Sequence, residues 1–70
     1  DAKTKLQEYC LKKYKTLPKY ETLEKSGPHH NPIFKVTVQI PQTKKIFGSG
    51  NSIKNAQQNA AKKIINFLEF

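Results

Sequence analysis

The stretch that decides the fold is Gly48-Ser49-Gly50-Asn51-Ser52-Ile53-Lys54-Asn55-Ala56-Gln57-Gln58-Asn59-Ala60-Ala61. A β-type run at residues 45–47 precedes it and is expected to stop at the two glycines, which allow a strand to turn sharply into a helix. Asn51 and Ser52 are of the types that cap helix N-termini. The alanines that follow let a helix approach a sheet or another helix closely. The stretch therefore predicts a short strand, a sharp turn and a long, closely packed helix.

Lys54 falls in the first turn of that predicted helix, where the helix dipole disfavours a cation. The same turn has backbone N–H groups that favour a bound phosphate. A cation placed against the dipole indicates an anion from outside, so we expect this turn to bind nucleic-acid phosphates. The two glycines do not complete a dinucleotide-binding pattern, because Ile53 stands where its third glycine belongs.

The apolar residues of the remaining chain predict four further elements and one domain, residues 1–70. Leu6, Tyr9 and Cys10 share one arc of a first helix. Apolar residues alternate with Lys35, Thr37 and Gln39 from residue 33 to residue 40, so we expect one face of this strand to be buried and the other to be exposed to water. The expected fold class is α+β, in the order α-β-β-β-α, with a three-stranded antiparallel sheet and two helices packed on one face. The expected ranges are 1–15, 20–25, 33–40, 45–49 and 52–68.

The charge balance points to a polyanion as partner. Thirteen lysines and no arginine stand against five acidic residues, which gives a formal net charge of +8. Such a balance indicates nucleic acid or an anionic membrane surface. Lysine suits phosphate oxygens, whereas bidentate reading of guanine favours arginine. We therefore expect contacts with the backbone of a nucleic acid more than with its bases. No apolar run approaches the length of about 20 residues that a membrane span needs.

The sequence offers little for catalysis or metal binding. The five acidic residues are scattered, and Cys10 falls on the apolar arc of the first helix. His29 and His30 are adjacent in a loop with no cysteine or acid nearby, which disfavours tetrahedral metal ligation. We expect no catalytic residue, metal or cofactor in these 70 residues. The single cysteine fits a reducing compartment, and we expect a cytoplasmic location. The chain begins at Asp1 without a methionine, which suggests a fragment or a processed form.

Four stretches together resemble the double-stranded RNA-binding domain across nearly the whole chain. The first also resembles the opening of this domain in bacterial ribonuclease III. The stretches are Lys3-Thr4-Lys5-Leu6-Gln7-Glu8-Tyr9, Leu17-Pro18-Lys19-Tyr20, Gly27-Pro28-His29-His30, and Gly48-Ser49-Gly50-Asn51-Ser52 continuing to Ala60-Ala61.

The resemblance implies three contact regions on duplex RNA. The first helix and the histidine-bearing loop would each enter a minor groove, and the start of the second helix would bind the phosphates between them. A carboxylate facing a polyanion is unusual unless it accepts a hydrogen bond, and the 2′-hydroxyl is a donor that DNA lacks. We therefore predict that Glu8 helps to exclude DNA. The implied contact residues are Thr4, Gln7 and Glu8; Pro28, His29 and His30; and Ser52 and Lys54.

The phosphate-binding turn, defined as residues 52–57, departs from the family pattern. Only Lys54 remains of three usual lysines, since Ile53 and Gln57 occupy the other two positions. Lys44, Lys45 and Lys62 are candidates to replace the missing charge.

In ribonuclease III the nuclease lies in a separate domain with Mg²⁺ ligands. The resemblance therefore implies that this piece positions double-stranded RNA for cleavage elsewhere. It would be monomeric, while the parent would be a homodimer through the nuclease domain. The alternative is a protein-interaction or dimerisation module with weakened RNA binding, favoured by Ile53, Gln57 and the apolar tail at residues 67–70. A membrane-surface role is disfavoured, because the alanines of the second helix suit close packing.

Overall fold

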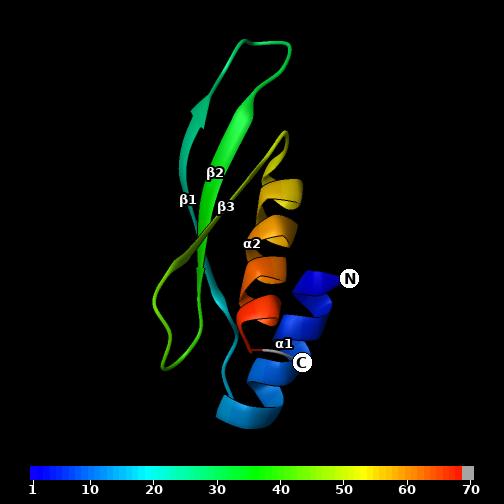
Figure 1. Cartoon of the computed structure of the whole chain (residues 1–70), viewed down its shortest axis with the longest axis vertical. Coiled ribbons are helices and arrows are strands. Elements are labelled where there is room, and N and C mark those ends of the chain that lie inside the picture. The colour runs from blue at the N-terminus through cyan, green and yellow to red at the C-terminus, as the bar shows by residue number, and fades with distance from the viewer. Residues whose placement is uncertain (69–70) are drawn as a thin grey trace.

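The computed structural model describes residues 1–68 as two helices and three strands. The strands lie in the order β1-β2-β3, and both pairs are antiparallel. α2 covers one face of the sheet, and α1 lies beside α2 on the same side (Figure 1). The α-β-β-β-α prediction is confirmed. The elements are α1 (Ala2–Tyr14), β1 (Lys19–Ser26), β2 (Ile33–Gln39), β3 (Ile46–Gly50) and α2 (Ile53–Leu68). The last two residues of the apolar tail, Glu69 and Phe70, lie outside the described part of the chain.

Local residue chemistry explains where α1 begins and ends. Asp1 is its N-cap, and one carboxylate oxygen accepts a hydrogen bond from the Thr4 backbone N–H at 2.8 Å. Lys15 follows the helix with φ 59°, in the left-handed region, and its N–H donates to the Leu11 carbonyl. Pro18 then stands directly before β1. The residue before a proline avoids helical angles, so Leu17 does not continue the helix.

The glycines of the opening stretch act differently from the prediction. β3 does not stop at them but continues through Gly48 to Gly50. Neither glycine has a positive φ. A Cβ on Gly48 would lie 2.4 Å from the Ala60 backbone nitrogen, and one on Gly50 would lie 2.8 Å from that of Ala56. Both glycines are therefore needed because the backbone of α2 lies directly on β3, and not because the chain must turn.

The core lies between α2, the inner face of the sheet and the apolar arc of α1. The alanines of α2 are fully buried, which confirms that the sequence prepares this helix for close packing. Tyr20 packs against the core, and its buried hydroxyl has no hydrogen-bond partner within residues 1–68. The core residues are Leu6, Cys10, Val36, Val38, Ile40, Ala56, Ala60, Ala61, Ile64 and Ile65.

The outer face of the sheet is less exposed to water than its alternating pattern predicts. Thr37 lies on that face but is only 3% exposed. Its neighbours across the sheet are Glu21 on β1 and Phe47 on β3, and their side chains cover it. A second covering contact places the Lys35 ammonium 5.0 Å from the centre of the Phe47 ring. The prediction that Thr37 is exposed to water is thus wrong, because the neighbouring strands carry larger side chains on this face.

Candidate nucleic-acid interface

The three predicted contact regions lie in succession along the long axis of the molecule. The loop between β1 and β2 forms one end, the N-terminus of α2 lies next to it, and α1 runs beside the second half of α2 (Figure 1). The Cα atoms extend 40 Å along this axis and 19 and 17 Å across it. The tertiary structure therefore presents the three regions one after another, as a ligand with a repeating groove would require.

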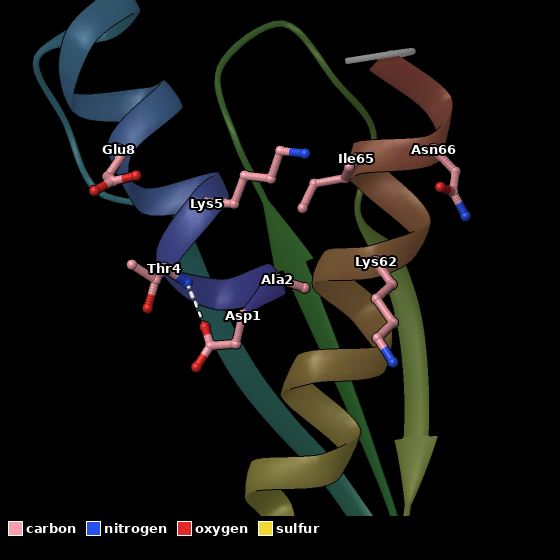
Figure 2. Close-up of a pocket in the computed structure, with 8 residues that line it drawn as sticks. All are labelled: Asp1, Ala2, Thr4, Lys5, Glu8, Lys62, Ile65 and Asn66. Carbon is pink, nitrogen blue, oxygen red and sulfur yellow. Dashed lines mark hydrogen bonds between the residues drawn. The ribbon is translucent and has the colours of Figure 1, made fainter.

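The region on α1 consists of Thr4, Gln7 and Glu8, which are all exposed. Figure 2 shows Thr4 and Glu8 on the α1 side of a groove whose other side belongs to α2. The buried residues Leu6 and Cys10 lie on the opposite arc. These three polar side chains are therefore free to contact a ligand without disturbing the helix packing.

A groove of about 480 Å³ separates the first turns of α1 from the C-terminal half of α2. Ala2 and Ile65 form its apolar part, and Lys62 stands on its α2 side (Figure 2). Lys62 is exposed and thus adds a positive charge next to the polar face of α1.

The region in the β1–β2 loop is a turn that presents both histidines. The Asn31 backbone N–H donates to the Pro28 carbonyl at 3.0 Å, which places His29 and His30 at the centre of the turn. Gly27 opens the turn with φ 84°, in the left-handed region that favours glycine. Pro28, His29 and His30 are all exposed, as a surface contact requires. Within residues 1–68 no group of three or more histidine, cysteine or acidic side chains could hold a metal ion.

The third region is the first turn of α2. The Ser52 hydroxyl oxygen accepts from the Asn55 backbone N–H at 3.0 Å, so Ser52 caps the helix. Its hydroxyl hydrogen remains available to donate to a phosphate oxygen. Lys54 is exposed, and no acidic residue lies in this turn to neutralise it. Ile53, which replaces a usual lysine, is 42% exposed and contributes no charge.

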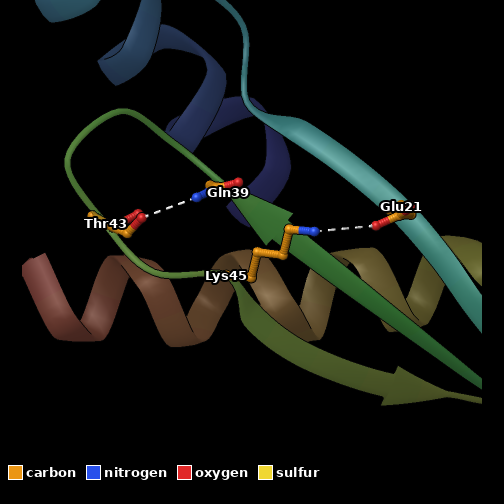
Figure 3. Close-up of polar contacts among 4 residues, drawn as sticks. All are labelled: Glu21, Gln39, Thr43 and Lys45. Carbon is orange, nitrogen blue, oxygen red and sulfur yellow. Dashed lines mark hydrogen bonds and ion pairs between the residues drawn. The ribbon is translucent and has the colours of Figure 1, made fainter.

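Two of the three candidate replacement lysines lie in the wrong place. Lys45 forms an ion pair with Glu21, with 3.5 Å between Nζ and Oε1, on the sheet face opposite to α2 (Figure 3). Lys44 belongs to the β2–β3 loop, at the opposite end of the molecule from the first turn of α2 (Figure 1). Of the three candidates, only Lys62 lies on the same side of the molecule as the predicted contact regions.

The structure identifies a further cation that sequence reasoning missed. The Lys3 side chain reaches from α1 to α2, where its ammonium donates to Gln57 Oε1 at 2.7 Å. It also lies 5.0 Å from the centre of the Tyr20 ring. A lysine from α1 thus stands beside the position where the family pattern has a lysine on α2. The sequence did contain a signal for this contact. Lys3 lies one turn before Leu6 on the helical arc that also contains Cys10, so it faces the packed side of α1.

The family comparison settles what kind of domain this is. The family model described as double-stranded RNA binding motif matches residues 2–68. The chain belongs to this family. The resemblance stated from the four sequence stretches is therefore confirmed, and the motif spans every described residue except Asp1.

The curated relatives agree with the ribonuclease III resemblance. The chain is 54% identical over 61 residues to ribonuclease 3 of Pelagibacter ubique, covering 87% of this chain and 28% of that protein. It is 50% identical over 66 residues to ribonuclease 3 of Leptospira interrogans, covering 94% and 27%. With ribonuclease 3 of Ehrlichia canis the identity is 48% over 69 residues, covering 99% and 30%. The chain therefore spans less than a third of the curated relatives it matches.

Solved structures of double-stranded RNA-binding domains share the fold. The second such domain of DRB4 is 34% identical with a TM-score of 0.68, covering 99% of this chain and 96% of that one. The first such domain of HYL1 is 36% identical with a TM-score of 0.69, covering 91% and 90%. The fold of the motif is thus shared with domains outside ribonuclease 3.

Proposed function

We propose that this motif binds double-stranded RNA through its A-form shape, backbone and 2′-hydroxyls, independently of sequence. The observation that carries the proposal is the succession of three exposed contact regions along one 40 Å axis. Domains of this kind span about 16 base pairs, with two successive minor grooves and the phosphates of the major groove between them. The loop and α1 would contact the two minor grooves, while Lys54 at the start of α2 would contact the phosphates.

The charge distribution supports phosphate contact without base reading. The chain carries a net charge of +8 from lysine alone, and lysine acts on phosphates as a point charge. Thr4, Gln7 and Glu8 combine donors and acceptors on one face of α1, and such groups suit 2′-hydroxyls. Lys62 beside the α1–α2 groove and Lys3 next to Gln57 would add to the positive field.

We further propose that the motif is the C-terminal substrate-binding module of a bacterial ribonuclease III, where it positions duplex RNA for cleavage. Three ribonucleases 3 at 48–54% identity support this. The endonuclease, its Mg²⁺ and homodimer contacts would belong to another domain, this piece would be monomeric, and the parent would be cytoplasmic. Among residues 1–68 no helix is long and apolar enough to cross a membrane.

A dimerisation module is the less favoured function. The sequence favoured it because Ile53 and Gln57 replace two usual lysines of the phosphate-binding turn, which lowers its positive charge. The structure places the ammonium of Lys3 next to Gln57, so positive charge is retained there. The comparisons also name RNA binding in the family description.

A gel-shift titration with duplex RNA, duplex DNA and single-stranded RNA of equal length, at two salt concentrations, tests the proposal. We expect the duplex RNA to bind most tightly and its affinity to fall steeply with salt, because lysine–phosphate contacts release counterions. Equal affinity for duplex DNA would contradict recognition of A-form shape and 2′-hydroxyls. Concentration-dependent dimers without RNA binding would support the dimerisation module instead.

A further inference from the structure

Asn51 joins two of the proposed contact regions. Its side-chain amide nitrogen donates to Asn31 Oδ1 at 3.0 Å and to the Pro32 carbonyl at 3.1 Å. Asn51 directly precedes the capping residue of α2, whereas Asn31 closes the histidine-bearing turn and Pro32 follows it. Both hydrogens of one amide group are therefore used to connect the β1–β2 loop to the start of α2, across about 20 residues of sequence.

Both ends of this connection are themselves fixed. On the α2 side, β3 ends at Gly50, whose backbone lies against Ala56 so closely that a Cβ would not fit. On the loop side, Asn31 donates its backbone N–H to Pro28, which closes the turn around His29 and His30. A displacement of the turn relative to α2 would thus break two hydrogen bonds of Asn51.

We propose that Asn51 is a positioning residue for duplex binding, which holds His29 and His30 at a fixed distance and orientation from Lys54. The inference rests on the proposed function of the motif. Two contacts that must fit successive grooves of a rigid duplex gain affinity when their spacing is set before binding, because less conformational freedom is lost on association. Asn51 itself would then act through the loop and not through a phosphate.

The first test compares Asn51→Ala with Asn59→Ala as matched control. Asn59 also donates its side-chain amide, to the Ser49 carbonyl at 2.7 Å, but this bond joins α2 to β3 and not to the loop. Asn51→Ala is expected to weaken binding of a duplex of about 16 base pairs by about fivefold, as loss of loop order predicts. The slope of log affinity against log salt should not change, because no phosphate contact is lost.

Three results of this test would overturn the proposal. Unchanged affinity in Asn51→Ala would show that the connection does not matter for binding. A salt slope lower by about one would show that Asn51 contacts a phosphate directly. An equal loss in Asn59→Ala would show that both variants act only through stability.

The second test is a double-mutant cycle with His30→Ala. If Asn51 acts through the loop, Asn51→Ala should cost little once His30 is absent, so the two effects should not add. Full additivity would contradict the proposal. A duplex too short to reach the loop should likewise abolish the difference between Asn51→Ala and the unaltered chain.

The free protein provides a test that does not depend on RNA binding. Backbone ¹⁵N relaxation of residues 29–31 should give order parameters of about 0.85 in the unaltered chain and below about 0.6 in Asn51→Ala. Unchanged order parameters would overturn the inference even if duplex RNA binds. If duplex RNA fails to bind while the order parameters fall, the proposed function fails and the connection through Asn51 stands.

Discussion

The two sides of α2 are fastened to the rest of the molecule by different kinds of contact. Against β3, the helix lies mainly on Gly48 and Gly50, with so little space that no Cβ fits, and the exposed Asn59 amide adds one hydrogen bond to Ser49. Toward α1 and the loop, it is connected by side-chain amides, with Gln57 accepting from Lys3 and Asn51 donating to Asn31. The first kind is steric and buried, and the second is polar and near the surface. We therefore expect substitutions on the β3 side to change stability most and substitutions on the polar side to change RNA binding most.

The largest effect is expected from a methyl group on the steric side. Gly48→Ala places a Cβ 2.4 Å from the Ala60 nitrogen and 2.6 Å from the Ala56 carbonyl oxygen, both of which are backbone atoms that cannot rotate away. We expect a loss of about 3 kcal/mol in the free energy of unfolding, the upper end for overpacking. Urea denaturation measures it. Ser49→Ala, at an exposed position of the same strand, is the control and should change stability little. If Gly48→Ala did not change stability, close backbone packing of α2 on β3 would be contradicted.

A second expectation concerns the phosphate-binding turn on the polar side. Lys54→Ala should leave stability nearly unchanged, weaken unrelated RNA duplexes alike, and lower the salt slope by about one. Fluorescence anisotropy at several salt concentrations measures both quantities. Lys44→Ala removes the same charge at the far end of the molecule, so it should leave the slope nearly as it is. An unaltered slope in Lys54→Ala would contradict direct phosphate binding.

A third expectation concerns the buried hydroxyl group of Tyr20. Its hydroxyl has no partner within the described residues, so Tyr20→Phe should stabilise the domain by up to about 1 kcal/mol. Burial, and then the nearby Cys10 thiol, raise the pKa of Tyr20 to about 12. Because the raised pKa favours the neutral form in the folded state, its contribution is present below about pH 10 and is lost as the pH rises toward 12.

Denaturation of the unaltered chain and Tyr20→Phe at pH values from 8 to about 11 separates these effects. The stability difference between the two proteins should widen above about pH 10, since only the unaltered chain has an ionisable side chain at position 20. A constant difference would show that the hydroxyl is not desolvated in the folded state.

The smallest expected effect concerns discrimination between RNA and DNA. Glu8 is exposed on the polar face of α1, where its carboxylate can accept a hydrogen bond from a 2′-hydroxyl. Glu8→Ala should lower the ratio of RNA to DNA affinity by about threefold, while removal of a negative charge raises affinity for both. Competition binding with matched duplexes measures the ratio. If the ratio did not change, Glu8 would have no part in excluding DNA.

Much of the fold was predictable from short-range patterns. The element order, the buried arc of Leu6 and Cys10, the alternation along β2 and the packed alanines of α2 all follow from periods of two or about 3.6 residues. Element ends differ from the predicted ones by a residue at most positions, and β3 runs on through Gly50 because its glycines remain extended.

The candidate site was only partly predictable. The predicted contact residues are exposed or half-buried at the surface, as α1, the loop and the α2 cap require. Lys3 was missed because an arc shared with core residues usually indicates packing, and its partner Gln57 is 54 positions away. Lys45 was proposed as a replacement charge because lysine type alone does not reveal that it faces Glu21 on the other side of the sheet.

The sequence by itself determined the elements and their buried faces, since each depends on residues that are close in sequence. It also determined the family, since four short motifs in order carry it. Only the tertiary structure decided what the opening stretch does. Gly48 and Gly50 let α2 lie directly against β3. The Asn51 amide bonds to the β1–β2 loop, and Gln57 accepts a hydrogen bond from Lys3. These contacts join residues between 6 and 54 positions apart and depend on how closely the packed elements approach, which no local pattern encodes.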